Sequence, residues 1–314
     1  MAPAPRSGRP FLERKQPDIY LAVLAFLGLA LSLSHGASAQ TEAELILKKE
    51  SLYNSLFVLQ EGPYRTLRFG HKDRHYREST YNPADPTELP SVYTRYVTVG
   101  AAYTDRLESA AVVGMGGGRM TWYLSHHIPE LKVTAIELDP EIVKIADKYF
   151  DVRANEQINV VTSDGRNFMR RTKENYDFII VDAYRGHFVP FHLLTKEFYE
   201  LLETRMNEGG VVVQNIAPNT MLFDHAIATI SAVFDNVDLY KASNNMVAVA
   251  YNGPHREKAE LQEEARARQG TYEFRYDIAD MIKERVRTPK FSDDKILTDD
   301  FAPANYLKSV ENHN

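Results

Sequence analysis

The chain of 314 residues contains no cysteine, which excludes disulfide bonds, cysteine-ligated zinc and thiol nucleophiles. It also lacks an excess of basic residues: 37 lysines and arginines stand against 43 aspartates and glutamates, giving a net charge of −6. Proteins that hold a phosphate backbone carry a basic stripe, so we do not expect nucleic acid as a partner. Hydrophobic residues make up 44% of the chain, enough to bury a full core.

The N-terminus contains one long uncharged run. Basic residues precede it, no Asp, Glu, Lys or Arg occurs in residues 19–41, and an A-x-A motif ends at Ala39. This layout is typical of a secretory signal peptide. Its apolar core of about 15 residues is shorter than the ~20 that a spanning helix needs, which favours cleavage over anchoring. We therefore predict residues 1–39 as a signal peptide or membrane anchor.

The rest of the chain divides by pattern. Residues 40–81 predict a small β-hairpin domain, in which ELILKKESLYNSLFVLQEG is expected to form a short helix or coil and then a strand. Residues 82–106 predict a proline-punctuated linker and a helix. In residues 107–314, β-branched apolar runs alternate with helical segments, which is typical of parallel strands buried on both faces. VDLYKAS and NMVAVAYN are expected to close the sheet as an antiparallel pair.

The predicted fold class is therefore α/β: a Rossmann-like, mostly parallel sheet flanked by helices and preceded by a small β domain. Its first strand runs into a glycine turn, AAVVGMGGGRM. Gly114, Gly116 and Gly118 allow the chain to turn sharply into a helix whose free N–H groups face a ligand. A dinucleotide fingerprint, G-x-G-x-x-G, would need glycine at Arg119, which argues against a nicotinamide cofactor.

Acidic residues end the next two strands. Glu137 lies about 20 residues beyond the glycine turn, where a carboxylate can accept hydrogen bonds from both ribose hydroxyls. Asp139 and Pro140 follow it and predict the N-cap and first position of a helix. Asp164-Gly165 ends the third strand and could present a carboxylate to an adenine amino group. An ordinary Asp-Gly turn is the alternative for that pair.

Asp182 ends the fourth strand at the carboxyl edge of the sheet, where open α/β folds bind ligands. It is the candidate catalytic residue, and capping of the next segment is the alternative. His187 and His192 lie in the loop after it and are candidates to line a substrate pocket, unless that loop is a lid covered by its own aromatic residues. His126 and His127 have no partner at ligand spacing, so we assign them to packing or surface roles and predict no metal.

With these motifs in view, residues 51–251 resemble the spermidine synthase-like family, which has the class I methyltransferase fold behind a small β domain. The segments that carry the resemblance are SLYNSLFVLQEGPYRTLRFG, DPEIVKIADKYF, SDGRNFM and VDAYRGHFVPFHLLTKEFYELL. ILTDDFAPANYL is similar to an L-T-D-D-x-A-P segment of longer members. The resemblance implies that Asp182 is the catalytic acid/base and that six residues bind the nucleoside: Gly114, Gly116, Gly118, Glu137, Asp164 and Gly165.

The candidate substrate contacts are Asn54, Tyr93, Tyr184, Arg185 and His192. The sequence also departs from the family pattern. Gly117 replaces the aspartate of G-G-G-D-G-G, which holds the donor's amine. The D-S-S/T-D-P motif reads Asp182-Ala183-Tyr184-Arg185, without the second carboxylate that holds the polyamine, and Asn54 replaces the glutamine of S-x-Y-Q.

Estimates of two energies show how these departures from the family pattern affect the choice of acceptor. Aminopropyl transfer needs a neutral amine, and deprotonating an amine of pKa near 10.4 at pH 7 costs about 4.6 kcal/mol. Asp182 within hydrogen-bond reach can take that proton. Arg185 close to the acceptor's other ammonium would repel it by up to about 4 kcal/mol at 4 Å with an effective dielectric constant of 20. Unless Arg185 points away, an acceptor with a carboxylate or a different amine fits better.

We therefore expect a transferase with S-adenosylmethionine or its decarboxylated form as co-substrate, which transfers an aminopropyl group to a small amine as in polyamine biosynthesis. Methyl transfer from S-adenosylmethionine is the runner-up, and an exported, non-catalytic nucleoside-binding module is the alternative of another class. The acceptor, the donor's carboxylation state and the oligomer stay open, with a homodimer as one option.

The leader predicts an exported protein, periplasmic or anchored in the inner membrane, whose only membrane contact is the N-terminal segment. A mis-called start codon would instead leave the protein in the cytoplasm. Cell fractionation with N-terminal sequencing tests this: we expect a periplasmic mature chain that begins at Gln40. A cytoplasmic chain that keeps residues 1–39 would contradict the export prediction.

Overall fold

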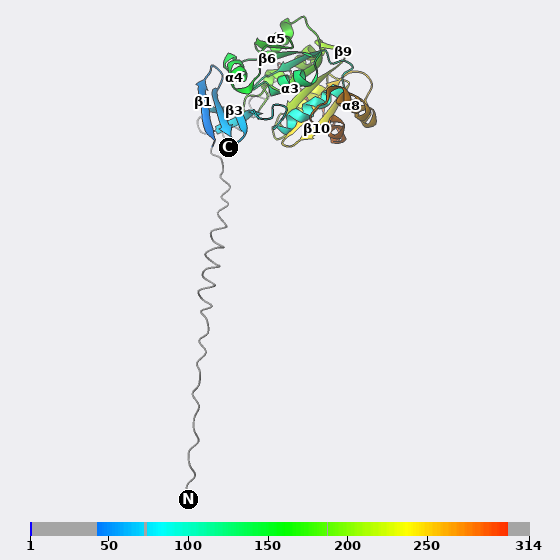
Figure 1. Ribbon diagram of the computed structural model, residues 1–314. Coiled ribbons are helices and arrows are strands. Elements are labelled where there is room, and N and C mark those ends of the chain that lie inside the picture. Colours follow the sequence, from blue (N-terminus) through cyan, green and yellow to red (C-terminus); the bar gives the residue numbers. More distant parts are fainter. Residues whose placement is uncertain (2–42, 72–73, 187, 301–314) are drawn as a thin grey trace. The chain divides into compact units, whose positions relative to one another are not determined.

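The computed structural model describes residue 1 and residues 43–71, 74–186 and 188–300 (Figure 1). The predicted leader beyond its first residue, His187 and most of the segment ILTDDFAPANYL lie outside the described residues. Within the described ranges, no helix is both long enough and apolar enough to span a membrane.

Four antiparallel strands form the first sheet in chain order: β1 (Glu44–Glu50), β2 (Ser55–Glu61), β3 (Tyr64–His71) and β4 (Arg74–Tyr81). The small β domain is confirmed, but the helix or coil expected at its start is wrong. β1 pairs with β2 from Glu44 opposite Gln60 to Glu50 opposite Ser55. The side chains of β1 are almost all exposed, so its sequence does not need the alternation of apolar and polar residues that reveals a half-buried strand. Pairing with β2 determines its conformation.

The second sheet has eight strands in the order β12-β10-β11-β9-β8-β5-β6-β7. The parallel strands are β5 (Ser109–Val113), β6 (Lys132–Glu137), β7 (Ile158–Thr162), β8 (Tyr176–Val181) and β9 (Met206–Ile216). The antiparallel strands are β10 (Asn236–Ala242), β11 (Asn245–Tyr251) and β12 (Arg285–Val286). The mostly parallel sheet and the closing antiparallel pair are therefore confirmed.

Helices cover both faces of this sheet. Core clusters assign to one face α2 (Val92–Val97), the 3-10 helix η1 (Thr98–Ala102), α3 (Arg119–His127), α8 (Lys258–Tyr272) and α9 (Ile278–Lys283). The other face carries α5 (Gly165–Arg171), the 3-10 helix η2 (Phe191–Leu193), α6 (Lys196–Glu203) and α7 (Phe223–Ser231). Successive residues of β5 alternate between the two cores, as a strand buried on both faces requires. A last 3-10 helix, η3 (Asp293–Lys295), contacts α7.

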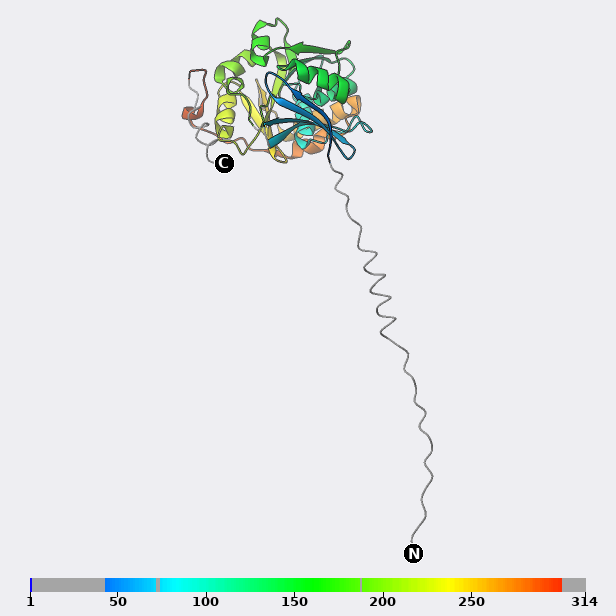
Figure 2. The ribbon, with the colours of Figure 1, turned by 90° about the vertical axis from the view of Figure 1, so that its left-hand side faces the viewer.

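The four-stranded sheet packs on α4 (Pro140–Phe150) through a third core cluster, which includes Leu56, Phe69 and Phe150. Figure 1 shows the blue strands beside α4, and Figure 2 shows the same strands from that side. Arg119 reinforces this contact: its guanidinium lies 4.3 Å from the ring centres of both Tyr81 and Trp122 and donates a hydrogen bond to the Phe150 carbonyl. The small sheet is thereby held against the helices that follow β5 and β6.

Asp177 joins three parallel strands where β8 begins. Its carboxylate accepts hydrogen bonds from the backbone N–H groups of Glu108 and Ser109, from the Ser109 hydroxyl and from the Asn207 side-chain amide, all at 2.8–3.1 Å. Burial alone would raise the pKa of Asp177, but these hydrogen bonds outweigh it and hold that pKa below its ordinary range.

We predict that Asp177→Asn lowers the free energy of unfolding at pH 7 by about 1–3 kcal/mol, because an amide nitrogen would face donors. A carboxyl group whose folded pKa is depressed stabilises the fold above its unfolded pKa near 3.8, and this contribution is lost as pH falls through the folded pKa. The difference between the two proteins in urea denaturation should therefore shrink below about pH 4. The exposed control, Asp147→Asn, should change little, and a deficit independent of pH would contradict the prediction.

Candidate active site

A cavity of about 640 Å³ opens at the carboxyl ends of the parallel strands, between them and β4. Its lining includes Asn54, Tyr93, Gly114, Gly116, Glu137, Asp164, Gly165, Asp182, Tyr184, Arg185 and His192. Segments that are far apart in the chain thus meet at one place, at the edge of the sheet where open α/β folds bind ligands.

The glycine turn forms one wall of the cavity. Gly114 has φ of +91°, and a Cβ built there would lie 2.5 Å from the backbone oxygen of Asp182, so only glycine permits this approach. Gly116 has φ of +53° and donates its N–H to Glu137. Gly118 is not among the lining residues. A Cβ at Gly118 would meet Val152, which places this glycine in the packing at the start of α3.

Glu137 is buried, with 7% of its surface exposed, and backbone N–H groups hold both carboxylate oxygens. Gly116 donates to Oε2 and Asp139 donates to Oε1, each at 3.0 Å. Burial raises the pKa of Glu137, and these hydrogen bonds oppose the rise. A carboxylate has about four acceptor sites, so Glu137 keeps capacity to accept a ligand hydroxyl. The structural role predicted for Asp139 is confirmed: it caps α4, with Pro140 in the first turn.

Asp164 combines two contacts. Its Oδ1 accepts the N–H of Asn167 at 2.8 Å, so Asp164 is the N-cap of α5 rather than part of an ordinary Asp-Gly turn. Its Oδ2 lies 3.1 Å from Nε2 of His192, a pairing that the sequence did not suggest. A Cβ at Gly165 would lie 2.4 Å from Cγ1 of Val113, so α5 approaches β5 closely behind this wall.

Asp182 lines the cavity directly after the end of β8. The Tyr93 hydroxyl donates to its Oδ2 and the Asn215 amide donates to its Oδ1, both at 3.0 Å. Asn215 is itself held, because its side-chain oxygen accepts a hydrogen bond of 2.8 Å from Asn245. Burial raises the pKa of Asp182 to about 6, although the bonds from Asn215 and Tyr93 lower it. A carboxylate with this pKa, fixed on both sides, has the properties of a general base.

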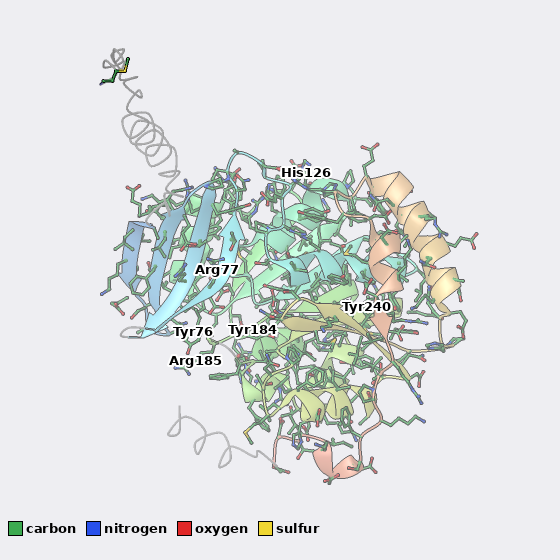
Figure 3. The ribbon with its side chains drawn as sticks, turned by 90° about the horizontal axis from the view of Figure 1, so that it is seen from below. Tyr76, Arg77, His126, Tyr184, Arg185 and Tyr240 are labelled. Carbon is green, nitrogen blue, oxygen red and sulfur yellow. The ribbon has the colours of Figure 1, made fainter. Side chains whose placement is uncertain are left out.

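Tyr184 and Arg185 follow Asp182 and differ in environment. The Tyr184 hydroxyl donates to the Asn215 carbonyl at 3.0 Å, and burial raises the pKa of Tyr184. The Arg185 side chain is exposed at the rim, where its backbone N–H bonds to the Phe188 carbonyl. Figure 3 shows Tyr184 and Arg185 near Tyr76, beside the four-stranded sheet. The exposure of Arg185 weakens the repulsion expected toward a bound ammonium.

Three cavity or support residues were missed from the sequence. Glu78 and Ser79 lie in β4, and Asn215 lies near the end of β9. A polar residue in the apolar run GGVVVQNI was an available signal for Asn215, because buried amides need partners. The mixed polar segment RHYREST offered no comparable signal for Glu78. Burial raises the pKa of Glu78 to about 9, and the charges of Asp182 and Glu137 add to the shift.

Ser79 contacts Gly117, the residue that stands where the family pattern has an aspartate. The Gly117 N–H donates to the Ser79 hydroxyl at 2.8 Å. A Cβ at Gly117 would lie 2.8 Å from the Cβ of Ser79 and 2.9 Å from a ring carbon of Phe150. An aspartate cannot occupy this position unless β4 or α4 moves.

The packing roles predicted for the adjacent histidines are confirmed. His126 stacks on Trp122 with ring centres 4.6 Å apart, and Nδ1 of His127 lies 3.2 Å from the Tyr272 carbonyl oxygen. Figure 3 shows His126 far from Tyr184 and Arg185. Among the described residues, no group of three or more His, Asp or Glu side chains is arranged to hold a metal ion.

Comparison with known proteins places this site in a family. The spermine/spermidine synthase domain matches residues 91–249, about half of the chain. A polyamine aminopropyltransferase of Vibrio vulnificus is 29% identical over 297 residues, which cover 91% of this chain and 98% of the relative. An N-terminal histidine N-methyltransferase of Emericella nidulans is 26% identical over 255 residues, or 71% of this chain and 45% of the relative.

The fold is shared with solved structures. A spermidine synthase in complex with the transition-state analogue AdoDATO superposes with a TM-score of 0.59 at 18% identity, over 85% of this chain and 86% of that protein. This likeness supports the fold, and the domain match supports the family. The chain belongs to the spermine/spermidine synthase domain family and, with it, to the transferases.

Proposed function

We propose that the protein transfers an aminopropyl group from decarboxylated S-adenosylmethionine to a small amine, with Asp182 as the base. The observation that carries this proposal is the Asp182 carboxylate, whose pKa is near 6 and which Tyr93 and Asn215 fix within the cavity. Gly114 lies against the backbone of Asp182, so the base adjoins the wall that would hold the nucleoside.

The donor would be held by this chain's own groups. Glu137 would accept the ribose hydroxyls through its free acceptor sites, and the start of α3 would face the nucleoside. Asp164 would meet the adenine amino group, although its two oxygens are already engaged by Asn167 and His192. AdoDATO in the related spermidine synthase structure supports a donor of this class.

The reaction needs one proton transfer and one displacement. Asp182 takes a proton from the acceptor's ammonium, and the resulting neutral amine nitrogen attacks the aminopropyl carbon next to the sulfonium. The C–N bond forms, the C–S bond breaks and methylthioadenosine leaves, while the new secondary amine keeps the positive charge. With a pKa of about 6 Asp182 is about nine-tenths ionised at pH 7, so it is ready to accept the proton. Holding donor and acceptor together supplies much of the remaining acceleration.

Methyl transfer is the second candidate. The N-methyltransferase relative and the absence of an acid at Gly117 favour it. Its donor carries an additional carboxylate, which would enter a cavity that already contains Glu137 and Asp182. Like charges in such a site repel, so electrostatics favours the decarboxylated donor. The non-catalytic module stays a third candidate, which predicts nucleoside binding without turnover.

We predict that Asp182→Asn reduces kcat by about 10²–10⁴-fold, because an amide cannot accept the proton. Nucleoside binding should persist, since Asp182 is assigned to the acceptor. The measurements are turnover of decarboxylated S-adenosylmethionine with 1,4-diaminobutane and calorimetric titration with methylthioadenosine. Exposed Asp280→Asn serves as the matched control. Wild-type-like turnover by Asp182→Asn would remove Asp182 from the mechanism, and no turnover by the wild type with any amine would favour the binding module.

The hydrogen bond from Asn215 stabilises the Asp182 carboxylate, so Asn215→Ala should raise its pKa above about 6. We expect kcat/KM of this variant, relative to wild type, to be lowest at pH 6 and below and to recover toward pH 9. The ratio cancels the titration of the amine substrate, which is the same for both proteins. Tyr93→Phe should shift the profile in the same direction. A loss of equal size at every pH would contradict the assignment.

A further inference from the structure

Glu78 is a carboxyl group in the cavity that has no hydrogen-bond or ion-pair partner among the described residues. Its Oε1 is inaccessible to solvent and accepts no hydrogen bond from the described residues. The neighbouring basic residue on β4, Arg77, is engaged elsewhere, in an ion pair of 2.9 Å with Glu61. A buried oxygen without a partner is costly, so its persistence calls for an explanation.

Each of the other carboxyl groups that line the cavity makes at least one hydrogen bond. Glu137 accepts two backbone N–H groups, Asp164 bonds to Asn167 and His192, and Asp182 bonds to Tyr93 and Asn215. Asp139 caps α4 through Oδ1, while its buried Oδ2 has no partner among the described residues. Among the lining carboxyl groups of the described chain, Glu78 is therefore the one that makes no hydrogen bond or ion pair.

The chemistry of the proposed reaction needs such a group. Both substrates carry a primary ammonium that does not react: the aminopropyl end of the donor and the distal end of a diamine acceptor. The sequence lacks acids at Gly117 and after Asp182, where the family pattern has them, and Gly117 leaves no room for a side chain. An ammonium without a carboxylate partner would be poorly held in a partly desolvated cavity.

We propose that Glu78 binds a non-reacting primary ammonium group of the substrates and so takes over the role of the missing acids. This inference rests on the proposed function for the identity of the ligands. Rotation of the Glu78 carboxyl group would turn Oε1 from its buried position toward the cavity, where the ammonium would donate a charge-assisted hydrogen bond to it.

The charges around Glu78 fit a carboxyl group that is neutral in the empty cavity and ionises when an ammonium group binds. Burial, followed by the charges of Asp182 and Glu137, raises the pKa of Glu78 to about 9, so the group is neutral at pH 7 in the empty cavity. Tyr93 and Tyr184 also lie within its electrostatic reach. An arriving ammonium compensates the negative charges, the carboxylate forms and its proton passes to solvent.

Calorimetry on the full chain can test this with two ligand pairs. The donor pair is 5′-deoxy-5′-(3-aminopropylthio)adenosine and methylthioadenosine, two thioethers that differ in the amine. The acceptor pair is 1,4-diaminobutane and 1-aminobutane, each titrated into protein loaded with methylthioadenosine. Glu78→Gln should weaken binding of the ligand with the extra ammonium in at least one pair by about tenfold or more. It should leave the other ligand of that pair unchanged.

The pair that responds identifies whether the ammonium belongs to the donor or the acceptor. Titration in buffers of different ionisation enthalpy should also show proton release in the wild type that Glu78→Gln loses. Glu78→Asp, which keeps the carboxyl group, should restore part of the affinity, and Glu44→Gln on exposed β1 is the matched control. Intact methylthioadenosine binding shows that a variant is folded.

Unchanged affinity of Glu78→Gln for all four ligands would overturn the role of Glu78. Should Glu78→Gln fail to fold, Glu78→Asp decides: its shorter side chain should weaken the extra-ammonium ligand alone, and wild-type affinity in both pairs would overturn the inference. The proposed function fails separately, if the wild type binds these ligands but transfers no aminopropyl group.

Discussion

The site depends on one constraint, the close approach of the glycine turn to the backbone that carries Asp182. β5 and β8 are neighbours in the sheet, and the Asp182 N–H donates to the Val113 carbonyl at 2.8 Å. Gly114 then passes so close to Asp182 that no other residue fits. One contact therefore places the base beside the wall proposed for the nucleoside, and the chemistry of the cavity follows from this proximity.

The four-stranded sheet and the residues that hold Asp182 determine the charge of the cavity. The four-stranded sheet packs on α4 and brings Glu78 and Ser79 to the edge of the glycine turn. Tyr93 from α2 and Asn215 from β9 hold the Asp182 carboxylate in one position. Acidic groups thus dominate a partly desolvated space, which suits cationic ligands and disfavours a donor with a carboxylate.

The sequence predicted what is encoded locally. Gly114, Glu137, Asp164 and Asp182 each lie at or just beyond the end of a short strand, and parallel strands bring such ends to one edge of a sheet. Contacts between segments that are distant in the chain could not be predicted, because no local sequence pattern encodes them. β1 is a strand because β2 pairs with it, and Glu78 reaches the cavity because its sheet docks on α4. His192 meets Asp164 through the fold of the loop after β8.

The central claim is that this cavity joins an aminopropyl group to an amine. Mass spectrometry of the products formed by the wild-type protein from decarboxylated S-adenosylmethionine and 1,4-diaminobutane tests it most directly. We expect methylthioadenosine and the aminopropylated amine in equal amounts. A methylated amine formed from S-adenosylmethionine, with no aminopropylated product from the decarboxylated donor, would contradict the account.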